Sequence, residues 1–323
     1  MKIVFLIGNG FDINLGMKTR YADFYSSYHK KKSESELIDG LKSTMRSDYP
    51  NWVDLELALG QYTENISSIE EFDEIYEDIC NSLADYLNDE EAKFNFDSID
   101  RAKFLNYICF PEQSLSRGDQ DEIIEFKSRW KTQRWGIDII TFNYTQSIEK
   151  ILKNPKFKLE IGNHDGVPIV LNGLEHIHGF TDNRMIMGVN DISQIKNEYF
   201  HYNDEVLEGL VKPRCNSIQR HNVDSDCVQK ISNSNLICIF GSSLGETDNF
   251  WWELICEQLR RDCRLIIFYR GQEILPRFEH KKSRIIRAVK ERFLSKVDLA
   301  DDEKLFIYEK IYVTVNSGFF GGL

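Results

Sequence analysis

The sequence predicts an α/β protein with a doubly wound, mostly parallel sheet that carries a large helical insertion. Short apolar runs rich in β-branched residues recur along the chain, and such runs are typical of strands buried on both faces. Helical stretches separate these runs, which implies βαβ units. The long segment between the first and second runs contains few strand signals, which indicates the insertion.

Four runs give the clearest strand predictions, and they cover residues 2–8, 137–142, 236–240 and 265–269. Weaker strand candidates cover residues 169–171 with 175–178, and 306–308 with 311–313. Ligands of open α/β sheets bind beyond the carboxyl ends of the strands. We therefore expect the polar residues that follow the strands to share one crevice.

An amphipathic helix is predicted inside the insertion, because apolar residues recur there at spacings of three and four. These residues are Ile69, Phe72, Ile75, Ile79, Leu83 and Leu87. Residues 64–100 hold thirteen acidic residues and one Lys, which favours a solvated face over a docking face for a basic partner.

Residues 216–235 are polar and aperiodic, so a loop is expected. We assign residues 1–24 and 136–323 to the α/β core and 25–135 to the insertion.

Composition restricts the class of protein. The formal net charge of −12 disfavours binding to nucleic-acid backbones and anionic membranes. The seven cysteines show no C-x-x-C spacing, so we expect reduced thiols and a cytoplasmic location. No apolar stretch is long enough to cross a bilayer, and no membrane association is expected.

The first strand ends in a glycine turn, residues 8–12 (GNGFD). A strand that runs into such a turn and then into a helix is a phosphate-binding geometry. A dinucleotide fingerprint would place a third glycine where Ile13 stands, and the Lys of a P-loop is missing as well. A tight turn that binds no ligand would have the same sequence, so both interpretations stay open.

Two further polar segments follow strand candidates. In residues 141–145 (TFNYT), Asn143 could position a water or a ribose hydroxyl, or it could cap the next helix. In residues 176–179 (HIHG), strand alternation places His176 and His178 on the same face. No third ligand has matching spacing, so we predict no metal. The remaining interpretations are a general base near neutral pH and a histidine hydrogen-bonded within the core.

The last polar segment is residues 240–248 (FGSSLGETD), which follows another buried run. The backbone N–H groups and hydroxyls of Gly241, Ser242 and Ser243 suit a ribose or a phosphate. Thr247 or Asp248 is expected to cap the helix that follows. Each of these segments is a weak signal alone, but together they predict one nucleotide-sized site.

Seven segments carry a resemblance to a known family, and in order they are residues 6–12 (LIGNGFD), 16–19 (GMKT), 21–24 (YADF), 51–56 (NWVDLE), 142–145 (FNYT), 176–179 (HIHG) and 241–248 (GSSLGETD). On these segments the sequence resembles the AbiH family of bacterial abortive-infection proteins. The resemblance spans residues 3 to about 252, and the opening segment is the most specific. The resemblance implies a role in defence against phage, with a phage-derived trigger and possible assembly into a homo-oligomer.

The same segments are similar, more distantly, to those of sirtuin-like NAD-consuming proteins. This second resemblance implies a Rossmann-like, sirtuin-like fold with NAD as substrate or ligand. It further implies that Asn143 orients the attack on the nicotinamide ribose and that His178 is the general base. The expected nucleotide-binding residues are Gly8, Asn9, Gly10, Phe11, Asp12, Thr141, Gly241, Ser242 and Ser243.

Two positions depart from the sirtuin pattern, which has a small residue at the place of Asn9 and commonly a Ser at that of Asp12. The chain also lacks a four-cysteine zinc module, which favours NAD hydrolysis over protein deacetylation. Two alternatives remain. One is a nucleotide-binding sensor or interaction protein without catalysis. The other is a metal-dependent nuclease that uses Asp54 and Glu56, although an acid-rich first turn of a helix accounts better for that pair.

Overall fold

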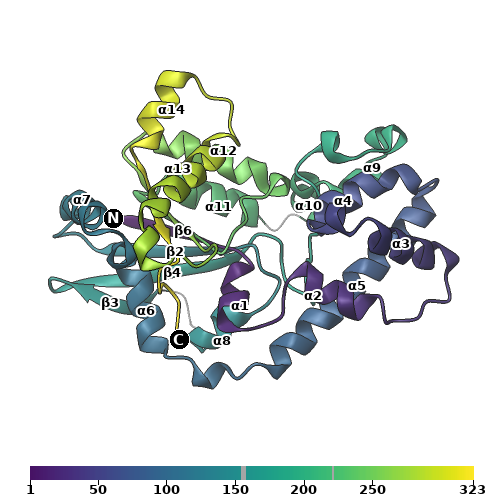
Figure 1. Ribbon diagram of the computed structural model, residues 1–323, viewed down its shortest axis with the longest axis horizontal. Coiled ribbons are helices and arrows are strands. Elements are labelled where there is room, and N and C mark those ends of the chain that lie inside the picture. The colour runs from purple at the N-terminus through teal and green to yellow at the C-terminus, as the bar shows by residue number, and fades with distance from the viewer. Residues whose placement is uncertain (154–157, 220–221) are drawn as a thin grey trace.

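The computed structural model describes residues 1–153, 158–219 and 222–323. Its centre is a seven-stranded sheet with the strand order β3-β4-β2-β1-β5-β6-β7 (Figure 1). The pairs are parallel except β3–β4, which is antiparallel. The strands are β1 Lys2–Ile7, β2 Trp135–Thr141, β3 Leu159–His164, β4 Val167–His176, β5 Leu236–Phe240, β6 Arg264–Tyr269 and β7 Ile311–Val315. The prediction of an α/β protein with a mostly parallel sheet is confirmed.

Both faces of the sheet are buried, because alternate residues of each central strand enter different cores. In β1, Phe5 packs in a core with α6 (Arg101–Cys109) and α8 (Ser147–Leu152). Its neighbour Leu6 packs on the opposite face. Helices on that face are α11 (Val223–Ser232), α12 (Asn249–Leu259), α13 (His280–Leu294) and α14 (Asp301–Tyr308). The continuous apolar runs of the sequence reflect this burial on two sides.

A third core lies beside the sheet and consists mainly of helices (Figure 1). Its helices are α2 (Tyr21–Tyr28), α3 (Glu36–Ser47), α4 (Leu55–Tyr62), α5 (Ile69–Lys93) and α9 (Asp204–Leu210). The predicted amphipathic helix is confirmed as α5, which buries five of its six predicted apolar residues, from Phe72 to Leu87, with the first of the six partly buried. Ser68 begins this helix by accepting a hydrogen bond from the N–H of Glu71.

The division into a core and an insertion stays a prediction. Residues 8–134 contain helices and loops and no strand. The helices α2 to α5 share their core with residues 185–211, which lie outside the predicted insertion. By contrast, α6 packs on the sheet, and so does Ile123 of α7 (Arg117–Ser128). No helix among the described residues is both long and apolar enough to cross a membrane.

Two local predictions were wrong. Residues 216–235 were expected to form a loop, but they contain the end of α10 (Lys212–Gln219) and the whole of α11. Residues 306–308 were expected to form a strand, but they end α14. The helix α11 buries only Cys227 and Ile231, and α14 buries only Ile307. Such narrow apolar faces give too few positions for helical spacing to be visible in the sequence.

Candidate functional site

The glycine turn after β1 packs directly against the backbone that follows β5. The N–H of Gly10 donates to the carbonyl of Gly241 over 2.8 Å, and the N–H of Phe11 donates to the carbonyl of Gly8 over 2.9 Å. A Cβ at Gly10 would lie 2.5 Å from Cα of Gly241. The glycines are therefore needed for close backbone packing. In α1 (Gly10–Leu15), the N–H groups of Gly10, Phe11 and Ile13 already have acceptors within the chain.

Asn9 and Phe11 also contact the protein itself. Asn9 exchanges two hydrogen bonds with Thr19, both of 2.6 Å, and so fixes the segment after α1. The ring of Phe11 is fully buried and packs edge-on against Phe104 and Phe320. Among the predicted side chains of this turn, that of Asp12 has a buried polar atom without a partner in the described part of the chain.

Asp12 is buried at 1% exposure. Its Oδ2 accepts a 2.6 Å hydrogen bond from the hydroxyl of Thr145, whereas its Oδ1 has no partner among the described residues. Burial raises the pKa of the Asp12 carboxyl to about 6, although the hydrogen bond from Thr145 opposes this shift. Asp12 is therefore a buried acceptor next to the end of β2.

Asn143 lies just beyond β2 and is fixed through its backbone. Its N–H donates to the hydroxyl of Thr141 over 3.1 Å, and this hydroxyl donates to the carbonyl of Ile7. The side chain is buried, and its Oδ1 finds no hydrogen-bond partner in the described part of the chain. Asp12 and Asn143 thus present two unpartnered acceptor oxygens beyond the ends of neighbouring strands.

The two histidines of the HIHG segment have different environments. The strand β4 ends at His176, and a left-handed Gly179, with a φ of +72°, then turns the chain. His176 uses both ring nitrogens, with Nδ1 2.8 Å from the carbonyl of Asn143 and Nε2 2.7 Å from Oε1 of Glu149. The expectation that both histidines share one strand face was wrong, because His178 lies beyond the strand. His176 is a satisfied core histidine.

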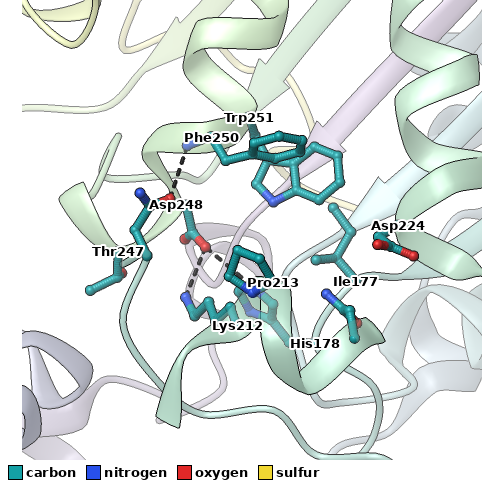
Figure 2. A pocket seen from close by; sticks show the side chains of 11 residues that line it. Ile177, His178, Lys212, Pro213, Asp224, Thr247, Asp248, Phe250 and Trp251 are labelled. Atoms are coloured by element: carbon teal, nitrogen blue, oxygen red, sulfur yellow. Dashed lines mark hydrogen bonds and ion pairs between the residues drawn. The ribbon is translucent and has the colours of Figure 1, made fainter. Parts of the chain in front are cut away.

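His178 is buried and lies beside Asp248 at the start of α12 (Figure 2). Its Nε2 is 3.1 Å from Oδ1 of Asp248, but the orientation of the two groups is not that of a hydrogen bond. Asp248 in turn contacts Nζ of Lys212 over 2.8 Å. Burial alone would raise the Asp248 pKa, but Lys212 and the adjacent His178 outweigh this effect and lower the pKa.

Lys212 connects the Asp248–His178 pair to the helical core. Its Nζ donates to Oε2 of Glu56 on α4 over 2.9 Å, and the hydroxyl of Thr247 donates to the same oxygen over 3.1 Å. The hydroxyl of Tyr144 lies 3.2 Å from Oε1 of Glu56. Burial alone would lower the Lys212 pKa, but Asp248 and Glu56 raise it. The ammonium therefore stays charged at all physiological pH values.

A cavity of about 60 Å³ opens beside these groups. His178, Lys212 and Asp248 line it on one side, and Trp251 lies across from them (Figure 2). Drug-sized ligands occupy pockets of roughly 300–1,000 Å³. The cavity as it stands accommodates a small molecule or water and is far too small for a dinucleotide.

The predicted residues after β5 are held by their own loop. Gly241 has a φ of +71°, which favours glycine, and Ser242 accepts a 3.0 Å hydrogen bond from the N–H of Leu244. Ser243 is exposed. Asp248 begins α12 as predicted, but its side chain makes no cap hydrogen bond and contacts His178 and Lys212 instead.

The acidic pair of the nuclease alternative has other contacts. Asp54 begins α4 and accepts a 3.2 Å hydrogen bond from the N–H of Leu57. Glu56 is paired with Lys212. Within residues 1–153, 158–219 and 222–323, no group of three or more His, Cys, Asp and Glu side chains could hold a metal ion. The observed contacts of both acids are those of helix capping and ion pairing.

The sequence interpretation missed Lys212 and gave Asp248 a capping role only. The one sequence signal for Asp248 was its place after a strand-end GSS segment. Lys212 begins a short, polar helix far along the chain, and nothing in its spacing indicates burial.

Comparison with known families gives one match. The family described as bacteriophage abortive infection AbiH matches residues 4–269, which include every predicted site residue. A search of curated proteins finds no match.

Proposed function

Because the chain belongs to the AbiH family of bacteriophage abortive-infection proteins, we propose that it acts in phage defence by hydrolysing NAD. The products would be nicotinamide and ADP-ribose. Asn143 and His178 are the proposed catalytic residues, in a Rossmann-like, sirtuin-like arrangement of the sheet, and the enzyme would act in the cytoplasm.

One observation carries this proposal: the buried Oδ1 atoms of Asn143 and Asp12 have no partner in the part of the chain that the structure describes. A buried acceptor without a donor costs about 1–3 kcal/mol, so such atoms are rare unless a ligand uses them. Ribose hydroxyls are donors and would satisfy both oxygens. Two acceptors beyond the ends of β1 and β2 support a ribose at this place.

The proposed chemistry needs little from the protein. The bond between nicotinamide and the ribose C1′ breaks, and nicotinamide leaves with the bonding electrons. A water molecule attacks C1′ and loses a proton to His178, which gives ADP-ribose. Asn143 and Asp12 would hold the ribose while positive charge develops on it. Nicotinamide is neutral after it leaves, so no further acid is required.

The small cavity supports an enzyme that is dormant until triggered. A dinucleotide could enter only after the segment with Lys212 or the segment Glu246–Asp248 moves away from His178. A phage-derived trigger or assembly into a homo-oligomer would provide that opening. The chain would then remain harmless to an uninfected cell.

The test measures free nicotinamide after the purified protein is incubated with NAD, alone and with lysate from phage-infected cells. Wild type should release nicotinamide in at least the second condition, and Asn143→Ala and His178→Ala should not. His201→Ala is a matched control, because His201 bonds the carbonyl of Ile195 in the helical region and should retain activity. NAD binding without turnover in both conditions would identify a sensor and overturn the proposal.

A further inference from the structure

The surroundings of His178 assign a role to two residues that the proposed reaction does not yet use. We infer that Asp248 positions His178 by facing its Nε2, so that Nδ1 is the nitrogen that accepts a proton, and that Lys212 holds Asp248 in this place. The relevance of this arrangement to catalysis rests on the proposed function. The arrangement of the three side chains is visible in Figure 2.

The contact between Asp248 and His178 is buried and short. The side chains are 17% and 4% exposed, and 3.1 Å separates Oδ1 from Nε2. A carboxylate facing one ring nitrogen favours the tautomer with the proton on that nitrogen. The other nitrogen then carries the lone pair. A small rotation of the imidazole would align the N–H with Asp248, and a bound substrate could provide it.

Lys212 keeps the carboxylate in place. Its Nζ lies between Oδ1 of Asp248 and Oε2 of Glu56, at 2.8 and 2.9 Å. Lys212 and Glu56 are buried and Asp248 is 17% exposed, so their attraction is strengthened by the low local polarity. Glu56 belongs to α4 of the helical core. The position of Asp248 therefore depends on how this core packs against the sheet.

The charges around His178 fix the sign of each expected effect. The anions nearby are Asp248, Glu56 beyond Lys212, and Asp224 on α11, which lines the same cavity. The one cation among these groups is Lys212, and the ring of Tyr144 lies 6.2 Å from that of His178. Removal of the Asp248 charge leaves Lys212 dominant and disfavours protonated His178. Removal of the Lys212 charge leaves Asp248 dominant and favours protonated His178.

The experiment records nitrogen NMR spectra of the full-length protein with labelled histidine, with His178→Gln to assign the signal. Wild type should carry the proton on Nε2. Asp248→Asn should lose this tautomer preference, and the titration midpoint of His178 should fall. In Lys212→Met the titration midpoint of His178 should rise. Opposite shifts from two variants cannot arise from general loss of structure. Unchanged tautomer and midpoint in Asp248→Asn would overturn the inference.

Asp138→Asn and Lys230→Met are the matched controls, because they break a second pair of charged side chains within the α/β part. Neither should change the His178 signal. In the nicotinamide assay, Asp248→Asn should lower kcat by roughly 10²–10⁴-fold with little change in KM, as for other carboxylates that orient a histidine base. If wild type releases no nicotinamide while the NMR shifts appear, the proposed function fails and the positioning stands. If kcat of Asp248→Asn is unchanged, the positioning has no catalytic role.

Discussion

The buried carboxyl of Asp12 shows how one residue can couple stability to pH. Burial raises its pKa to about 6, whereas aspartates in unfolded chains titrate near 3.9. The folded protein therefore binds this proton more tightly than the unfolded chain does. Its contribution to stability is full below about pH 4 and is lost as the pH rises towards 6. The ionised carboxylate lowers the stability of the fold, and one of its oxygens has no partner among the described residues. Both features suit a ligand-binding role.

This linkage leads to a prediction for Asp12→Asn. The variant has no carboxyl to ionise, so it should gain stability relative to wild type as the pH increases. The gain should approach about 3 kcal/mol at pH 7, from a shift of about two pKa units at 1.4 kcal/mol each. Urea unfolding at pH 4, 5, 6 and 7 measures it. A difference between the two proteins that is independent of pH would contradict this account of Asp12.

At the scale of elements, the turns after β1 and β5 act as one unit. The carbonyl of Gly241 accepts the N–H of Gly10, and the N–H of Gly8 donates to the carbonyl of Phe240 over 2.9 Å. Both turns precede the polar side chains of the candidate site. Their mutual packing fixes where Asp12 lies relative to the start of α12.

Gly10→Ala tests this packing. The new Cβ would meet backbone atoms of Gly241 at 2.5 and 2.8 Å, and backbone cannot rotate away as a side chain can. We expect a loss of about 1–3 kcal/mol in the free energy of unfolding. Gly40→Ala is the control with opposite sign, because Gly40 is exposed in α3 with no atom within 4 Å. It should gain about 0.5–1 kcal/mol. Equal effects of the two substitutions, measured by urea unfolding, would refute the packing role.

The sequence was informative where burial is extensive. The central strands have apolar side chains on both faces, so their runs are visible without a structure. Prediction failed for α11 and α14. The helix α11 has two buried residues and α14 has one, so the apolar pattern of each is too weak to indicate a helix. It also missed β3, an antiparallel edge strand with no fully buried residue. Edge strands and short surface helices depend on tertiary contacts, which sequence spacing does not record.

The candidate site shows the same limit. Asn143 and His178 were identified because they follow strands, and the structure places both in buried positions there. Lys212 and Glu56 meet across 156 residues of sequence, and neither belongs to a strand end. Long-range ion pairs leave no periodic signal. The partners of a site residue are therefore harder to predict than the residue itself.

At the scale of the whole molecule, Glu56 and Lys212 connect the helical core to the sheet. Glu56 lies on α4, Lys212 begins α10, and Asp248 begins α12 beside the sheet. Lys212 and Asp248 also line the 60 Å³ cavity, which must enlarge before a dinucleotide can bind. Opening of the site and loosening of this connection are therefore expected to be one event.

A double-mutant cycle tests this connection. Lys212→Met leaves the buried carboxylate of Glu56 without its cation, so it should cost about 3–5 kcal/mol. Glu56→Gln should cost less, because Lys212 keeps Asp248 as a partner. The double variant should cost less than the sum of the two, because it removes both charges. Hydrogen exchange should become faster in α4, α10 and Glu246–Asp248 of the single variants, while β1, β2 and β5 stay protected. Lys230→Met, which breaks a separate ion pair on α11, should leave α4 unchanged. Additive costs, or faster exchange throughout the sheet, would mean that these residues stabilise the molecule as a whole and do not control access to the site.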